Sequence, residues 1–253
     1  MNARPTSTVS VVMAVHNGMR YLDAQICSVL SQLDVGDELI VIDDFSRDGS
    51  FEWLTNLKDE RIHLYRHERN TGVLRSFEDG LQKSRNDIVF LCDQDDVWLP
   101  GKRDAVVSEF GREPRALIVI SDAEVIDARD RVLAASFMAT RHGFKGSFRH
   151  TLISNRYLGC AMAVRRELID AALPIPTTVP MHDMWLGALG SLLGQVSYIP
   201  RPLIRYRRHG GNVTPSHRQS WSRMVRWRFS LLGATCQRIA RIALGLHRQK
   251  PRA

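Results

Sequence analysis

The closest cluster of reactive side chains in this sequence is a set of three carboxylates within four residues. Asp93, Asp95 and Asp96 follow the apolar run 88–92 and precede an aromatic residue, Trp98. Like charges crowded at the end of a strand repel one another unless a cation lies among them. Mg²⁺ or Mn²⁺ suits such a site, because hard cations take carboxylate oxygens together with substrate phosphates. The alternative is a solvated acidic turn, which an apolar strand directly before the triplet makes less favoured.

Two further places combine a carboxylate with the start or end of an element. Asp43 and Asp44 follow the short apolar run 39–42. Asp183 lies among proline, methionine, tryptophan and leucine, and desolvation by such neighbours would raise its basicity. The alternative for each is a structural one: an Asx-turn for Asp44, and an N-cap for Asp183 at a helix expected over 184–193.

The apolar pattern predicts the elements that position these carboxylates. Strands are expected at 9–15, 39–42, 62–65, 88–92 and 117–121, and helices at 21–32, 50–57, 73–84, 102–110 and 184–193, with Ser50 as an N-cap. Nearly all-apolar strands that alternate with helices indicate an α/β fold, with a mostly parallel sheet covered on both faces. Ligands bind such sheets at the carboxyl ends of the strands, where the acidic clusters lie.

Four segments resemble, in order and spacing, the motifs of family 2 glycosyltransferases: Val9–Gly18 (VSVVMAVHNG), Val41–Ser50 (VIDDFSRDGS), Asn70–Leu81 (NTGVLRSFEDGL) and Phe90–Trp98 (FLCDQDDVW). The DQDDVW wording of the last segment, together with His182–Trp185 (HDMW), resembles the rhamnosyltransferase-like branch of that family. The resemblance covers about 7–215 and implies an inverting enzyme with the GT-A fold. It implies a catalytic domain at 1–216, with a nucleotide-sugar-binding half at about 7–115, an acceptor-binding half at 116–216, and a basic tail at 217–253.

Matching positions in the family imply a role for each candidate residue. The donor would be bound by Val15, Asn17, Asp43, Asp44, Arg75, Asp93, Gln94 and Gly159, and a divalent metal on its diphosphate by Asp95, Asp96 and His209. Asp183 would be the general base that takes the proton from the acceptor hydroxyl. The acceptor would lie against Trp185 and Trp227, although the RxxRW match that includes Trp227 is more readily explained by chance.

Several of these assignments have a structural alternative. Asp44 would accept a hydrogen bond from the ring N–H of uracil or thymine, and Phe45 stands where the family more often has glycine, which predicts a different backbone in this loop. Arg75 would pair with phosphate or be a solvated helix arginine. Gly159 would allow close approach of a sugar or belong to a tightly packed strand. His209 would bind the metal or diphosphate, or be structural.

The charge is distributed unevenly. The chain has 253 residues and a formal net charge of +8, but 1–183 holds 22 basic and 27 acidic side chains, whereas 184–253 holds 13 basic and none that is acidic. On a helix, one stripe of the tail is apolar (Trp221, Val225, Phe229, Leu232, Cys236, Ile239, Ala243, Leu246), and the opposite face is basic (Arg223, Arg226, Arg238, Arg241, Arg248). Such a helix is expected on an anionic membrane; the alternative is packing against the acidic body.

The sequence thus predicts a metal-dependent inverting glycosyltransferase. It would use a nucleoside-diphosphate sugar, with dTDP-L-rhamnose as the expected donor, and a lipid-linked or polysaccharide acceptor at the cytoplasmic face of the plasma membrane. A sugar-nucleotide nucleotidyltransferase is the first rival, but the turn at 15–18 lacks that class's Gly-rich basic loop. A nucleic-acid binder, suggested by the pI of 9.7, has no use for the acidic clusters, so no nucleic-acid partner is expected.

The cysteines and the apolar runs indicate the cellular compartment that is expected for this protein. The four cysteines lie far apart, which argues against a zinc site and for a reducing compartment. The apolar run 9–15 is too short for a signal-peptide core and indicates a strand, and no stretch approaches the length of a transmembrane helix. A cytoplasmic protein that lies on the membrane surface is therefore expected.

Overall fold

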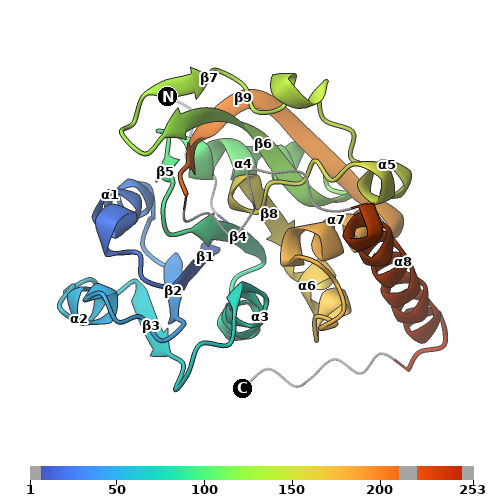
Figure 1. The fold of residues 1–253 in the computed structure, drawn as a ribbon, viewed down its shortest axis with the longest axis horizontal. Coiled ribbons are helices and arrows are strands. Elements are labelled where there is room, and N and C mark those ends of the chain that lie inside the picture. Colours follow the sequence, from blue (N-terminus) through green and yellow to red (C-terminus); the bar gives the residue numbers. More distant parts are fainter. Residues whose placement is uncertain (1–6, 211–220, 247–253) are drawn as a thin grey trace.

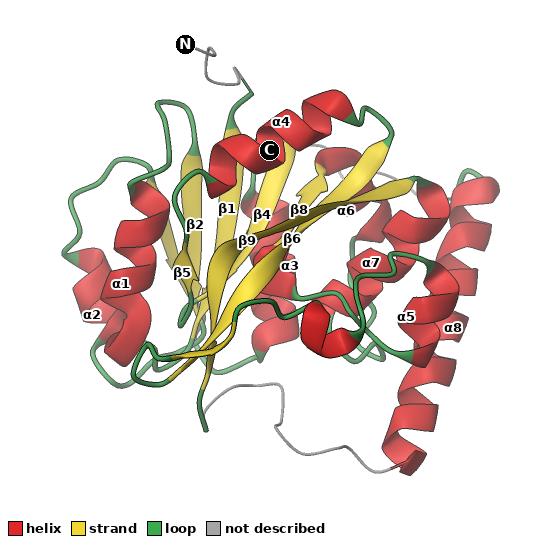
Figure 2. Cartoon of the chain, turned by 90° about the horizontal axis from the view of Figure 1, so that it is seen from above, coloured by secondary structure: helices red, strands yellow, loops and turns green. Residues whose placement is uncertain are grey.

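A mixed β-sheet with helices on both faces forms the body of the molecule (Figure 1). The computed structural model describes residues 7–210 and 221–246. The strands run in the order β3-β2-β1-β4-β8-β6-β9-β5, and β7 pairs with β6. Figure 2 shows α1 and α4 on one face of the sheet and α3, α6 and α7 on the other. The predicted α/β class with helices on both faces of the sheet is confirmed. The sheet is mixed rather than mostly parallel, because four of its eight strand pairs in the described residues run antiparallel.

The strands are β1 (Val9–Val15), β2 (Glu38–Asp43), β3 (Ile62–Arg66), β4 (Ile88–Asp93), β5 (Val97–Trp98), β6 (Ala116–Asp127), β7 (Val132–Ala134), β8 (Met162–Arg165) and β9 (Gln195–Arg208). The helices are α1 (Met19–Leu30), α2 (Ser50–Thr55), α3 (Val73–Lys83), α4 (Lys102–Arg112), α5 (Phe148–Ile153), α6 (Arg166–Ala172), α7 (His182–Leu193) and α8 (Trp221–Ala243). Two 3₁₀ turns are η1 (Ala139–Arg141) and η2 (Gly159–Ala161).

The first four strands bring the predicted acidic clusters to one edge of the sheet. β1 lies between β2 and β4, and all three pairs of strands among β1 to β4 run parallel. Val15 is level with Asp43 of β2, and Ala14 is level with Asp93 of β4. The residues of β2 are buried throughout, as expected for a strand covered on both faces. The loops after β1, β2 and β4 therefore meet at one place.

The second half of the chain makes the sheet mixed. β8 pairs antiparallel with both β4 and β6, and β9 runs parallel to β6 but antiparallel to β5. The sequence predicted β6 only over 117–121, because polar residues from Asp122 onward interrupt the apolar pattern, although the strand continues to Asp127. α2 begins one residue after Gly49, so Ser50 is not its N-cap. The Ser50 hydroxyl instead donates a hydrogen bond to Asp48.

The helix α8 packs beside α5 and α7 (Figure 1). Its buried residues are Leu231, Thr235 and Arg238. Arg238, predicted on the basic face of the helix, instead lies against the body, where its guanidinium donates to the carbonyls of residues 171, 173 and 174 at and just after the end of α6. Arg248, with the rest of 217–220 and 247–253 in the predicted tail, lies outside the described residues. Within the described residues, no helix is long and apolar enough to cross a membrane.

Candidate active site

The turn after β1 is held closed by Gln94 from the loop after β4. The Gln94 carboxamide oxygen accepts the backbone N–H of His16 at 2.7 Å, and its amide donates to the His16 carbonyl at 3.1 Å. A Cβ on Gly18 would lie 2.4 Å from the same oxygen, so a larger residue here would push the Gln94 side chain out of this contact. Val15 is buried, and its carbonyl accepts the backbone N–H of Asp44 at 2.7 Å. Gln94 and Val15 thus shape the loops that would surround a donor.

Asn17 and Asp43 join the turn after β1 to the loop after β2. Asn17 has a φ of 52° and accepts the backbone N–H of Arg47 at 2.8 Å. Asp43 is fully buried, accepts the backbone N–H of Ser46 at 3.1 Å and lies 3.3 Å from the Nε of Arg66. Both side chains therefore act first on the backbone around the site.

Phe45 keeps a conformation that glycine favours. Its φ is 62°, in the left-handed region that is costly for a residue with a bulky side chain. The guanidinium groups of Arg47 and Arg66 lie 4.9 and 5.8 Å from the centre of its ring. Cation–π attraction offsets part of the backbone cost.

The carboxylate of Asp44 is buried and closely surrounded by the loop before α3. One oxygen accepts the backbone N–H of Thr71 at 2.7 Å, and the other accepts the backbone N–H of Gly72 at 2.7 Å. A ring nitrogen of His67 lies 2.8 Å from the first oxygen. Burial alone would raise the pKa of Asp44, but these hydrogen bonds outweigh it and lower the pKa. The side chain is thus a fixed anion that holds two loops together.

Arg75 lies on the exposed side of α3, where it pairs with neighbouring carboxylates. Its guanidinium is 2.9 Å from Asp79 and 3.4 Å from Glu78, and half of the side chain is exposed. These i,i+3 and i,i+4 pairs fit the alternative of a solvated helix arginine.

The loop after β4 gathers ligand atoms that suit a metal. Oxygens of Asp93 and Asp96 and the sulfur of Cys160 all lie within 4.8 Å of one another. Burial and the carboxylates of Asp96 and Asp95 raise the pKa of Asp93 well above its usual value, and burial with Asp95 raises the pKa of Asp96 to about 7. Burial also raises the pKa of the Cys160 thiol, which disfavours the thiolate as a ligand. The two carboxylates fit a hard divalent cation.

A buried lysine lies beneath these carboxylates. The ammonium of Lys102, at the start of α4, donates to the Cys160 carbonyl at 2.6 Å and lies 4.6 Å from the centre of the Trp98 ring. Burial lowers its pKa, while the thiols of Cys160 and Cys92 and the carboxylates of Asp96 and Asp93 oppose that change. Lys102 links the acidic loop to η2. Neither Lys102 nor Cys160 is among the site residues predicted from the sequence, although Cys160 directly follows the predicted Gly159.

The predicted metal ligands Asp95, Asp96 and His209 contact different partners in the structure. His209 Nε2 lies 2.6 Å from Asp95 Oδ2, whereas Asp96 Oδ1 accepts the backbone N–H of Arg207 at 2.8 Å. Arg207 is buried, donates to the Asp95 carbonyl at 2.7 Å and lies 4.6 Å from the centre of the Tyr21 ring. The end of β9 is therefore fixed against the acidic loop. Asp93, predicted to bind the donor, groups with Asp96 and Cys160 as a possible metal ligand.

Asp183 lies in the first turn of α7, which begins at His182 rather than at 184. Its carboxylate accepts the backbone N–H of Met184 at 2.6 Å, so it is not the N-cap, a position that Met181 occupies. Burial raises the pKa of Asp183 to about 6, although hydrogen bonds from Met184, Asn155 and Gly159 oppose this rise. A carboxylate with such a pKa is both ionised and basic near neutral pH. Asn155 is a site residue that the sequence did not indicate.

His182 is packed in the protein interior beside Asp183. Its ring stacks on Phe77 with centroids 3.8 Å apart, and burial lowers its pKa to about 3. Neither ring nitrogen has a hydrogen-bond partner within the described part of the chain. A Cβ on Gly159 would lie 3.0 Å from His182 Nε2 and 3.5 Å from the Cβ of Asp183. Gly159 is therefore required for the close packing of η2 on the first turn of α7.

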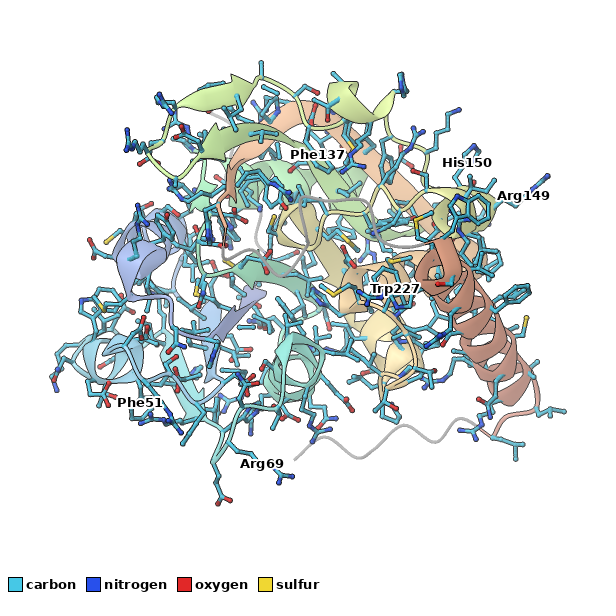
Figure 3. All side chains as sticks on the ribbon, in the orientation of Figure 1. Phe51, Arg69, Phe137, Arg149, His150 and Trp227 are labelled. Atoms are coloured by element: carbon cyan, nitrogen blue, oxygen red, sulfur yellow. The ribbon has the colours of Figure 1, made fainter. Side chains whose placement is uncertain are left out.

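The two tryptophans predicted to bind the acceptor have different environments. Trp185 is fully buried, and its indole N–H donates to the Ala172 carbonyl at 3.0 Å. A ring without exposed surface has no face for a sugar, so the prediction for Trp185 is wrong. Trp227 is half-buried on α8 and points toward the body of the molecule (Figure 3).

The fold and these carboxylates define an α/β protein whose acidic side chains gather at the carboxyl edge of its sheet, where they could bind a divalent cation. The sequence profile of glycosyl transferase family 2 matches residues 10–173, and the chain belongs to this family.

The chain is also similar in sequence to proteins that are named as glycosyltransferases. An uncharacterized glycosyltransferase of Nostoc is 26% identical over 81% of the chain, and the match spans 66% of that relative's length. The Escherichia coli UDP-Glc:alpha-D-GlcNAc-diphosphoundecaprenol beta-1,3-glucosyltransferase WfgD is 25% identical over 72% of the chain and 69% of its own length. Residues 1–349 of Staphylococcus aureus TarS, solved with UDP-GlcNAc, match at a TM-score of 0.68 and 16% identity, covering 92% of this chain and 66% of that one. The TarS match shows a shared fold.

Proposed function

We propose that this protein is an inverting glycosyltransferase that moves a sugar from a nucleoside-diphosphate donor to a hydroxyl of a lipid-linked acceptor. Its catalytic domain is 1–216, with the donor half at about 7–115 and the acceptor half at 116–216. The position of Asp183 carries the proposal: a carboxylate with a raised pKa lies beside η2, one strand away from the acidic loop after β4. Support for the acceptor comes from WfgD, whose name specifies a diphosphoundecaprenol-linked sugar.

In this proposal each part of the site has a separate task. The loops joined by Asn17, Asp44 and Gln94 enclose the nucleotide. Asp183 accepts the proton of the attacking hydroxyl, because inversion needs one base on the side opposite the leaving diphosphate. Gly159 and Asn155 hold that carboxylate through hydrogen bonds, so that it is already oriented when the acceptor arrives.

Asp93, Asp95 and Asp96 would hold Mg²⁺ or Mn²⁺, with His209 next to Asp95. When bound, the cation would neutralise charge on the leaving diphosphate. The identity of the donor sugar and nucleotide is proposed from the DQDDVW and HDMW segments, whose resemblance favours dTDP-L-rhamnose. The proposed setting is the cytoplasmic face of the plasma membrane, in the synthesis of a cell-surface polysaccharide, with 217–253 as the membrane-binding tail.

Asp183→Asn tests the base directly. The amide keeps the size of the side chain but cannot accept a proton, so donor binding should persist while transfer falls by about 10³-fold or more. Asp23→Asn, on the exposed side of α1, is the matched control and should transfer at the normal rate. Transfer by Asp183→Asn at a rate close to that of the control would contradict the proposed role.

Nucleic-acid binding is the second function worth a test, because of the pI of 9.7. Calorimetric titration with UDP or dTDP in the presence of Mn²⁺ should show saturable binding that EDTA removes. Titration with duplex DNA should show only weak, salt-sensitive association. The opposite pattern would favour the nucleic-acid function.

A further inference from the structure

Much of the apolar surface of α8 points away from the protein that it packs on, although Ile239 also packs against the core. Leu231, Thr235 and Arg238 face the body. At about 100° per residue, the adjoining arc of roughly 120° has no charged side chain along the whole helix. That arc comprises Trp221, Ser222, Val225, Phe229, Leu232, Gly233, Cys236, Ile239, Ala240 and Ala243. Trp221 is 76% exposed and Phe229 69% exposed. An amphipathic helix normally buries such a face.

Polar contacts on the inner side fix α8 in this orientation. Arg228 donates to the Ile153 carbonyl at 2.6 Å, and the Ser230 hydroxyl donates to the Thr178 carbonyl at 2.5 Å. Arg238 donates to three carbonyls at the end of α6 and lies 5.3 Å from the centre of the Trp185 ring. Rotating the helix to bury its apolar arc would break all of these contacts. The arc therefore stays outside.

Basic side chains flank the arc, with an apolar neighbour on α5. Arg223, Arg226 and Arg241 are exposed on the side of α8 that follows the arc. On α5, Ile153 is 68% exposed and Arg149 points outward (Figure 3). We name Trp221, Phe229, Ile153, Arg223, Arg226 and Arg149 the docking surface. Aromatic and aliphatic side chains beside arginines match the interface of an anionic bilayer.

Two observations favour a lipid surface over a protein partner as the occupant. The chain from 184 to 253 holds 13 basic and no acidic side chains, so it brings no carboxylate of its own that would repel an anionic surface. A second copy of this docking surface would bring arginine against arginine, which opposes self-association. In addition, α8 begins on the side of the molecule where β1, β2 and β4 end (Figure 2).

We propose that the docking surface binds the interface of an anionic lipid bilayer. This inference rests on the proposed function for its purpose, since a lipid-linked acceptor lies in that bilayer. In this arrangement the aromatic and aliphatic side chains of the docking surface enter the headgroup region. The flanking arginines pair with lipid phosphates. The inner face of α8 stays on the body.

Co-sedimentation of the full chain with vesicles tests the surface. The chain should pellet with phosphatidylcholine vesicles that contain about 30% phosphatidylglycerol, and much less with phosphatidylcholine alone. The double variant Trp221→Asp with Phe229→Asp should reduce the bound fraction at least about tenfold. Val35→Asp is the matched control, because Val35 is 99% exposed in the turn before β2; it should bind like the unmodified chain.

The outcomes separate the docking surface from the catalytic proposal. Equal sedimentation of the double variant and the control would overturn the docking surface. A dimer that the double variant dissociates, without vesicle binding by either form, would also overturn it in favour of self-association. Release of nucleoside diphosphate from the donor in solution is measured in parallel. If that release is absent although vesicles bind, the proposed function fails and the docking surface stands.

Discussion

Replacing Asp183 by asparagine should make the folded protein more stable as well as inactive. Burial raises the pKa of Asp183 from 3.8 to about 6, which corresponds to about 3 kcal/mol of unfavourable free energy for the ionised form. The amide removes that cost but weakens the hydrogen bonds from Met184 and Gly159. The net stabilisation at pH 7.5 should therefore be about 1–3 kcal/mol.

The sign of this effect depends on pH. Below about pH 3.8 the carboxyl is protonated in both the folded and the unfolded chain, so its raised pKa has no effect on stability. As the pH rises toward 6, the unfolded chain releases its proton first, and the wild-type protein loses stability relative to the variant. Above 6 the difference is constant.

Thermal unfolding of Asp183→Asn and the unmodified chain at pH 7.5 and pH 4 measures this difference. The variant should unfold about 3–10 °C higher at pH 7.5, and the gap should shrink at pH 4. Asp23→Asn should match the unmodified chain at both pH values. An Asp183→Asn protein that is less stable at pH 7.5, or a gap that does not change with pH, would refute the claim that this carboxylate is desolvated.

Three further predictions concern the same chain. Transfer by the unmodified protein should rise about tenfold per pH unit below 6 and level off above it, because Asp183 must be ionised; a rate that is flat from pH 5 to 8 would exclude its role as base. Arg238→Gln should lower the free energy of unfolding by about 2–4 kcal/mol, since it removes donors from three partly buried carbonyls. Arg241→Gln, exposed one turn away, should change it by less than about 0.5 kcal/mol; equal denaturant midpoints for the two variants would contradict the contact of Arg238. Gly18→Ala should weaken calorimetric binding of UDP or dTDP, because its Cβ would displace Gln94; unchanged affinity would show that this loop does not shape the site.

The first half of the fold follows from the sequence for a simple physical reason. Strands buried on both faces must be apolar throughout, so β1, β2 and β4 stand out as short runs that end in polar residues. Their order then places Asp43 and Asp93 on either side of the end of β1. Residues at those ends could be identified without coordinates.

The rest of the site depends on contacts between distant parts of the chain. Lys102 reaches Cys160, and Arg207 reaches Asp96, across 58 and 111 residues. Such buried partners have no periodic signal in the sequence. The side of α8 that packs is also not the most apolar one, because Arg238 finds three carbonyls there. Backbone carbonyls at and just after the end of α6 contribute to this orientation, and the pattern of side chains alone does not reveal them.

Incubation with a panel of nucleotide sugars is the most direct test of the central claim, that the carboxylates at this edge of the sheet support sugar transfer. UDP- and dTDP-linked sugars, including dTDP-L-rhamnose, are mixed with the full chain and Mn²⁺ or Mg²⁺, and released nucleoside diphosphate is measured. The account predicts release from at least one donor, loss of release with EDTA, and loss in Asp96→Asn. Release that continues undiminished in EDTA, or the absence of release from every donor alongside nucleotide binding that needs no metal, would contradict it.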